Sequence, residues 1–144
     1  MSARASLVDE LGLAPHPEGG YYRETWRVPS SVTTAAGERS LATAILFLLE
    51  PGQSSRWHRV RSGELWLWQG GGPLVLSLGG LGASPSLASE VVVGPDPSAG
   101  HALQHLVAPS EWQAARPAGT TYSLVACVVS PGFDFDDFEL EETL

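Results

Sequence analysis

Hydrophobic residues along this chain follow the short period of β-structure. After residue 19 they alternate with polar residues or form brief apolar runs, as expected for strands whose successive side chains point to opposite faces. The pattern predicts nine strands, at residues 20–28, 41–50, 54–60, 64–69, 74–78, 87–93, 102–107, 112–116 and 121–130. A short helix is predicted at residues 5–11, with Gly12 ending it.

Turn-forming residues separate the predicted strands at regular intervals. Pro51-Gly52, Ser62-Gly63, Gly79-Gly80 and the run 94–97 are examples. Evenly spaced short strands favour a sandwich or barrel. No linker or internal repeat divides the sequence. We therefore expect one all-β domain over residues 1–144: a helix and lid segment at 1–19, a barrel at 20–130 and a covering segment at 131–144.

Composition agrees with this prediction and excludes some partners. The 144 residues include 16 Gly and 11 Pro, and only 17% are charged. The net charge of −8 disfavours nucleic acid, whose phosphates attract clustered basic side chains. Six acidic residues follow position 133, so the acidity is local. No signal sequence or membrane-length apolar run is found, which predicts a cytoplasmic protein that contacts no membrane.

The segment 52–71 carries the most informative polar residues. If Arg61 to Gly63 formed a hairpin loop, His58 would pair with Trp66, and Glu64 would lie diagonally across from His58. His58, Glu64, Trp66 and Trp68 would then share one face. Aromatic rings mixed with a few polar groups are typical of small-ligand pockets. In the alternative reading, His58 and Glu64 form a plain stabilising pair and both Trp residues belong to the core.

Several sequence blocks together resemble a known family. Gly52, His58, Val60, Glu64 and Gly71 have the spacing of the first cupin motif, with Val60 in place of its second histidine. The blocks 16–24, 58–66, 112–117 and 130–135 resemble, in this order, the uncharacterised cupin-five subfamily. The resemblance spans nearly the whole chain.

This resemblance implies an RmlC-like double-stranded β-helix (a jelly-roll barrel), usually a homodimer, with a pocket inside the barrel. It implies no established reaction. Metal-binding cupins typically offer three His and one Glu, and the matching positions here are His58, Val60, Glu64 and Gln113. A divalent metal at His58, Glu64 and Gln113 is therefore a weak expectation, since two usual imidazoles are lost. Gln113 can instead hydrogen-bond a polar organic ligand.

The N-terminal block 16–24 is expected to pack at the pocket mouth. In the strand that follows, Tyr21 and Arg23 lie on one face, where Arg23 could bind a carboxylate or phosphate of a ligand. In the alternative reading, Glu18 and Arg23 tie this segment to the barrel or to a second subunit.

Three functions compete. The first is an isomerase-, epimerase- or lyase-like enzyme acting on a small polar metabolite, with His58 as base, Glu64 as its acid or orienting partner, and Tyr21, Arg23, Trp66, Trp68 and Gln113 binding the ligand. The second is a ligand-binding or sensor module with the same pocket and no turnover. The third is a metal-dependent oxygenase. Because one fold hosts all of these, the sequence leaves open whether the protein is an enzyme.

Overall fold

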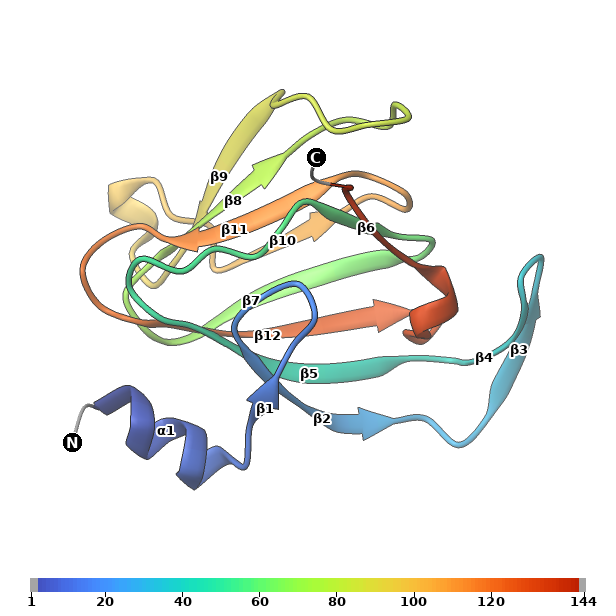
Figure 1. Ribbon diagram of the computed structural model, residues 1–144, viewed down its shortest axis with the longest axis horizontal. Helices are drawn as coiled ribbons and strands as arrows, with labels where there is room; N and C mark the ends of the chain where they lie inside the picture. Colours follow the sequence, from blue (N-terminus) through green and yellow to red (C-terminus); the bar gives the residue numbers. More distant parts are fainter. Residues whose placement is uncertain (1–2, 143–144) are drawn as a thin grey trace.

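Two β-sheets facing one another form the body of the protein (Figure 1). The structure, a computed structural model, describes residues 3–142. One sheet has the strand order β1-β2-β5-β12-β7-β10, and the other has the order β13-β6-β11-β8-β9. A separate two-stranded sheet, β3-β4, projects from one end of the molecule, and helix α1 lies near the opposite end (Figure 1).

The elements of the first sheet are β1 (Ala14–Pro15), β2 (Tyr21–Arg27), β5 (Thr43–Leu49), β12 (Ser123–Ser130), β7 (Gly63–Gly71) and β10 (Gln104–Val107). Those of the second are β13 (Phe138–Leu140), β6 (His58–Val60), β11 (Gln113–Pro117), β8 (Leu74–Leu78) and β9 (Ser89–Val93). The remaining elements are α1 (Ala3–Leu11), β3 (Ser31–Thr34), β4 (Gly37–Ser40) and the 3-10 turns η1 (Pro97–Ala99) and η2 (Phe135–Asp137).

The core lies between the two sheets. In β12, Ser123, Val125, Cys127 and Val129 are buried while the residues between them are half-buried, as expected of a strand with one face inside. From the same sheet Phe47 and Trp66 pack edge to face, with ring centroids 6.1 Å apart. Leu74 and Leu76 of β8 are buried in the same cluster.

The predicted fold is confirmed. The protein is mostly β-strand with one short helix, and each predicted strand overlaps an observed one. Gly12 ends α1 with a φ of 65°, the left-handed conformation expected after a helix. Four strands were not predicted: β1, β13 and the hairpin β3-β4.

The predicted hairpin between residues 58–60 and 64–66 is wrong. His58 pairs with Gln113 of β11 and Leu140 of β13, whereas Glu64 pairs with Val129 of β12 and Val107 of β10. The chain crosses from one sheet to the other after Val60. His58 and Glu64 therefore belong to opposite sheets and are not neighbours on one sheet.

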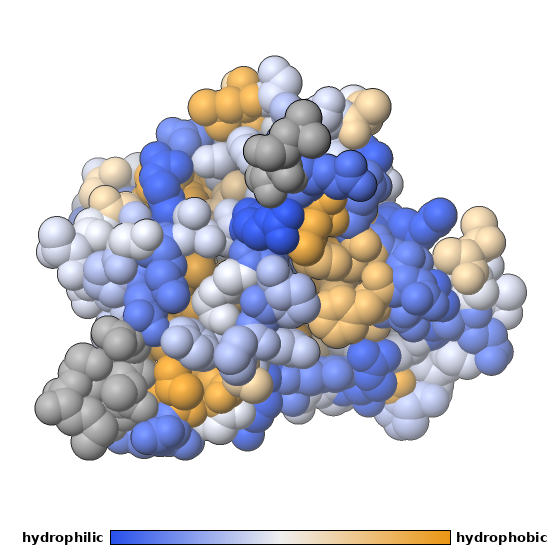
Figure 2. Space-filling model, in the orientation of Figure 1, coloured by the Kyte–Doolittle hydropathy of each residue, from blue (hydrophilic) through white to orange (hydrophobic). Residues whose placement is uncertain are grey.

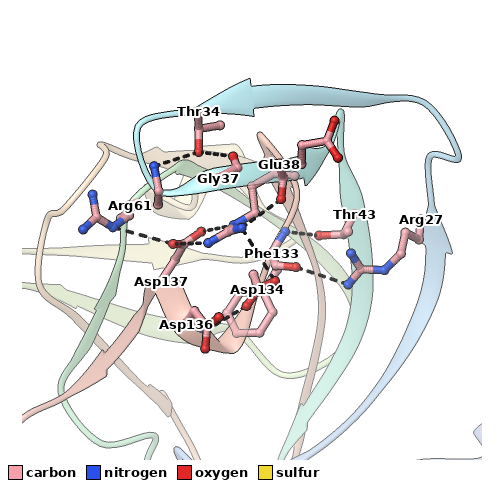
Figure 3. A network of polar contacts seen from close by, with 12 residues as sticks. Arg27, Thr34, Gly37, Glu38, Thr43, Arg61, Phe133, Asp134, Asp136 and Asp137 are labelled. Carbon is pink, nitrogen blue, oxygen red and sulfur yellow. Dashed lines mark hydrogen bonds and ion pairs between the residues drawn. The ribbon is translucent and has the colours of Figure 1, made fainter.

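The C-terminal segment 131–142 packs across one end of the barrel and is held by arginines from several elements. Arg39 of β4 donates two hydrogen bonds to the Asp137 carboxylate, at 2.8 and 3.0 Å. Arg61 lies 3.6 Å from the same carboxylate, and Arg27 donates to the Phe133 carbonyl (Figure 3). Three of the six acidic residues of this segment, Asp134, Asp137 and Glu139, thus lie in ion pairs with arginines.

Hydrophobic surface gathers near the middle of the face shown in Figure 2. Phe135, in the C-terminal segment, is one of the exposed large apolar residues, with 49% of its surface accessible. Over residues 3–142, no helix has both the length and the apolar character needed to cross a membrane.

Candidate functional site

A small cavity opens inside the barrel, between the sheets and beneath the C-terminal segment. Its volume is about 30 Å³, enough for one or two water molecules. Its walls combine ionisable and apolar side chains from both sheets, the N-terminal turn and the C-terminal segment. They are His16, Glu18, Tyr22, Thr43, Ile45, His58, Val60, Glu64, Cys127, Val129, Phe133 and Phe138.

A tight turn between β1 and β2 brings Glu18 into this cavity. The turn is closed by hydrogen bonds between the backbones of His16 and Gly20 and of Gly19 and His16, both 3.0 Å. Gly19 and Gly20 have φ values of 110° and 75°, and a Cβ at Gly20 would lie 2.6 Å from the Leu48 carbonyl oxygen. Only glycine therefore allows the turn to pack this closely against β5.

The imidazole of His58 is fixed by its own strand. Its Nδ1 lies 2.8 Å from the Arg56 carbonyl oxygen, which can only accept, so Nδ1 carries the proton of the neutral ring. Nε2 is then unprotonated. It lies 3.2 Å from Glu18 Oε2. The two atoms form a close pair, and Oε2 is buried with no hydrogen-bond partner among the residues that the structure describes.

Glu64 faces the cavity from the opposite sheet and is held by two neighbours. Gln113 Nε2 donates to Glu64 Oε1 at 2.8 Å, and Trp66 Nε1 donates to Gln113 Oε1 at 2.8 Å. Because the indole N–H can only donate, these two hydrogen bonds fix the orientation of the Gln113 amide. The Cys127 thiol also hydrogen-bonds Glu64.

Burial favours the neutral forms of the ionisable groups of the cavity. It raises the pKa of Glu64 to about 7, against the opposing effect of its hydrogen bonds, and raises the pKa of Glu18 well above its ordinary value, with the nearby Glu64 adding to the shift. Burial also lowers the pKa of His58 to about 4 and that of His16 to about 4. The close contact of His58 with Glu18 is therefore a contact between neutral groups at neutral pH.

Aromatic rings close the cavity on the side of the C-terminal segment. The His58 and Phe138 rings lie 5.5 Å apart, and His16 contacts Tyr22 edge to face at 4.5 Å. Phe133 packs against Phe138 at 5.9 Å. The covering segment expected at 131–144 thus supplies two cavity walls within the residues that the structure describes.

Of the site residues predicted from the sequence, some line the cavity and others lie behind its walls. His58 and Glu64 line the cavity together. Gln113 is fully buried behind Glu64, and Trp66 is fully buried in the core, so both reach the cavity only through Glu64. Trp68 packs against the core and donates to the Gly72 carbonyl.

Tyr21 and Arg23 do not line the cavity. Tyr22, on the other face of β2, does, and Arg23 is exposed. The cavity therefore uses the face of this strand opposite to the predicted one. The ligand-binding roles proposed for these side chains stay predictions.

Sequence reasoning had no site role for His16, Glu18, Tyr22 or Cys127. The signal was present in the block 16–24, where a Gly pair directly follows a His and a Glu. A glycine pair of this kind allows a close turn, and the polar residues before it are then candidates for burial. Cys127, the single cysteine of the chain, is buried.

The typical metal set of the cupin superfamily is not assembled here. Val60 has no atom that can bind a metal. The oxygen of the Gln113 amide accepts a hydrogen bond from Trp66, and its nitrogen donates one to Glu64. Within residues 3–142, no three or more His, Cys, Asp or Glu side chains are arranged to hold a metal ion. These residues therefore do not fit the ligand set of three His and one Glu.

Two facing sheets with an enclosed polar cavity define the protein as a double-stranded β-helix of the cupin class. Residues 5–141 match the family model described as Cupin superfamily (DUF985), the cupin-five family. The chain belongs to this family. No curated protein is significantly similar to it in sequence.

Solved structures agree with this assignment. A hypothetical protein from Leishmania major is 35% identical, with a TM-score of 0.86, over 98% of this chain and 88% of that one. A protein from Shewanella oneidensis is 33% identical, also with a TM-score of 0.86, over 99% of this chain and 86% of that one. A double-stranded β-helix protein from Klebsiella pneumoniae, 17% identical with a TM-score of 0.58, covers 94% of this chain and 95% of its own, and shares the fold alone.

Proposed function

We propose that the cavity binds a small polar metabolite and transfers protons on it, as an isomerase, epimerase or lyase does. One observation carries the proposal: an unprotonated imidazole nitrogen of His58 and a Glu64 carboxyl with a pKa of about 7 face one enclosed cavity from opposite sheets. A group with a pKa near the working pH is the most effective proton donor or acceptor.

The contacts suggest a role for each group. His58 Nε2 accepts the proton removed from the substrate, and the Arg56 carbonyl stabilises the imidazolium that forms by holding its Nδ1–H. Glu64, protonated below about pH 7, returns a proton to the substrate at its other face. Gln113 is a positioning residue, since it touches only Glu64 and Trp66 among these groups. Glu18 stands beside His58 Nε2, where its carboxyl can relay the proton back.

Proton exchange with solvent tests this proposal. The purified protein is incubated in D₂O with small amino ketones and hydroxy ketones of three or four carbon atoms, and deuterium uptake into each compound is followed by NMR. Glu64→Gln keeps the shape of the side chain but cannot transfer a proton, so exchange should fall by about 100-fold or more. His58→Ala should have a similar effect, and Glu38→Gln, on the exposed hairpin, should have none. Equal exchange in all four proteins would remove both residues from the mechanism.

Binding without turnover is the second candidate, and the size of the cavity favours it. A volume of about 30 Å³ leaves little room for a substrate to change shape. Native mass spectrometry of the purified protein would reveal a retained ligand. A stoichiometric ligand that is recovered chemically unchanged, with no deuterium exchange, would support a carrier or sensor and contradict the enzyme.

A further inference from the structure

The groups on the described walls of the cavity that can become charged near neutral pH are carboxyls. Glu18 and Glu64 line the cavity, and no arginine is among its described wall residues, although the chain has eight basic residues. Arginines that contact the C-terminal segment over the cavity pair with its acidic residues: Arg39 and Arg61 with Asp137, and Arg59 with Glu139. An anionic ligand would therefore find no countercharge here, and its burial would be strongly unfavourable.

Once Glu18 and Glu64 lose their protons, the cavity offers several hydrogen-bond acceptors. Glu18 Oε2 is buried and has no hydrogen-bond partner among the described residues, and the residue has only 6% of its surface exposed. His58 Nε2 presents a lone pair, because Nδ1 holds the proton. The Glu64 carboxyl supplies further acceptor capacity beyond the bonds from Gln113 and Cys127. A group with several N–H donors and no acceptor, such as a primary ammonium, complements this set.

The apolar walls suit the same group. Tyr22, Phe133 and Phe138 bring three aromatic rings to the cavity, and the faces of such rings attract cations when water is excluded. Carboxylates combined with aromatic rings are a favourable environment for an organic ammonium. Carboxylates and aromatic ring faces give no such favourable interaction to a phosphate or carboxylate ligand.

We infer that the ligand of this cavity carries a positively charged nitrogen, a primary ammonium or an equally small organic cation, held by Glu18, Glu64 and His58. This inference names the ligand class of the proposed site and rests on the proposal that the cavity binds a metabolite. It replaces the anion-binding role expected for Arg23, which is exposed on the other face of β2.

Binding of a cation is then coupled to loss of protons. Glu64 faces His58 and Glu18 across the cavity, with Cys127 and Gln113 beside it on neighbouring strands and His16 next to Glu18. None of these neighbours carries a positive charge at neutral pH, since burial lowers the pKa of both imidazoles. The cation would therefore bind the ionised carboxyls and displace their protons, and its affinity should rise with pH.

Three probes of similar size and different charge test the inference: methylammonium, methanol and formate. Each is titrated to 200 mM into the full chain at pH 6 and pH 8 at constant ionic strength, and binding is read from ¹H–¹⁵N chemical shifts of the cavity residues. Probes this small bind at best in the millimolar range. We expect saturable shifts with methylammonium only, with an affinity at least about tenfold higher at pH 8.

Two variants and a matched control locate the binding. Glu18→Gln and Glu64→Gln should each weaken methylammonium binding by about tenfold or more, while the exposed Glu38→Gln should leave it unchanged. Unchanged binding in both cavity variants, provided their spectra remain folded, would overturn the inference.

The outcomes also separate this inference from the proposed function. Binding of methanol or formate at least as strong as that of methylammonium would overturn the inference and leave a metabolite site in place. Stoichiometric Zn²⁺ binding that displaces methylammonium would show a metal site instead and also overturn it. No binding by any probe would count against both proposals.

Discussion

Burial favours the neutral forms of two carboxyls and two imidazoles around the cavity, and it shifts their pKa values in opposite directions. Glu18 and Glu64 hold protons that exposed carboxyls would lose, and His16 and His58 lack protons that exposed imidazoles would gain. Burial causes all four shifts because it disfavours the charged form of each group. The folded protein therefore differs from the unfolded chain in where it holds protons.

These shifts predict how stability depends on pH. Between about pH 4.5 and 6.5 the folded state holds extra protons on the two carboxyls, and the unfolded chain holds extra protons on the two imidazoles, so the differences roughly cancel. Above pH 6.5 only the carboxyl difference remains. The free energy of unfolding should then fall by roughly 1.4 kcal/mol per pH unit for each carboxyl still protonated. For Glu64 this fall ends near pH 7, and for Glu18 it continues higher.

Urea denaturation at pH 5.5, 6.5, 7.5 and 8.5 measures this profile. The double variant Glu18→Gln/Glu64→Gln should lose the decline above pH 6.5, because an amide has no proton to release. Glu38→Gln should behave as the wild type. A wild-type stability that stays constant from pH 6.5 to 8.5 would contradict the assigned protonation states.

At the scale of elements, the C-terminal segment is the least intrinsically stable part of the site. Strand β13 has three residues, and η2 is a single 3-10 turn, so neither would persist without tertiary contacts. The contacts of Arg39 with Asp137 and of Arg27 with Phe133 supply them (Figure 3). Access to the cavity past Phe133 and Phe138 therefore depends on these contacts.

Asp137→Asn should loosen this cover without disturbing the barrel. The variant loses the charge that pairs with Arg39 and Arg61, so amide exchange in residues 133–140 should become about tenfold faster, as in other local openings. Exchange in β5 and β12 should not change. The control Glu90→Gln breaks an ion pair with Arg116, which joins β9 and β11 and involves no residue of the C-terminal segment, and it should leave the segment protected. Equal exchange in both variants would show that the arginines do not hold the cover.

The strands could be predicted from the sequence because their signal is local. Alternation and turn residues lie within each segment, which is why β5, β7 and β12 were found close to their true bounds. The hairpin β3-β4 also had a local signal, since the β-branched residues of 31–34 are followed by Gly37, and it was overlooked. Strand β13 had none, because three residues pairing with β6 are specified by tertiary structure alone.

The arrangement of the site could be predicted from local sequence patterns even less than the strands could. His58 and Glu64 do meet, but across the barrel, since pairing between strands is decided by contacts distant in sequence. Glu18 joins them through a turn 40 residues before His58, as the sequence numbering shows. The family resemblance placed the pocket inside the barrel, whereas local pattern alone assigned the wrong strand partner and the wrong face of β2.

For the molecule as a whole, the outer face of the first sheet carries a row of apolar residues. In direct register across four strands lie Ala44, Val128, Leu65 and Leu106. The first three are half-buried, and Leu106 is 61% exposed. A row without charge across four of the six strands of a sheet is unusual on a protein surface that faces only water.

We propose that a second copy of the chain covers this face, which gives the homodimer implied by the family resemblance. The acidic residues of the C-terminal segment lie outside this row, so two copies meeting here keep most of their charge of −8 apart.

In a two-fold interface each substitution occurs twice. Leu65→Glu and Leu106→Glu should therefore each weaken association by about 100-fold or more, because two carboxylates would be buried without partners. Light scattering after gel filtration should report a wild-type mass near 30 kDa, twice the 15.2 kDa of one chain, and about half of it for either variant. Leu81→Glu, in an exposed loop, should stay dimeric. A monomeric wild type, or a dimer that survives both strand variants, would mean that this face has another role.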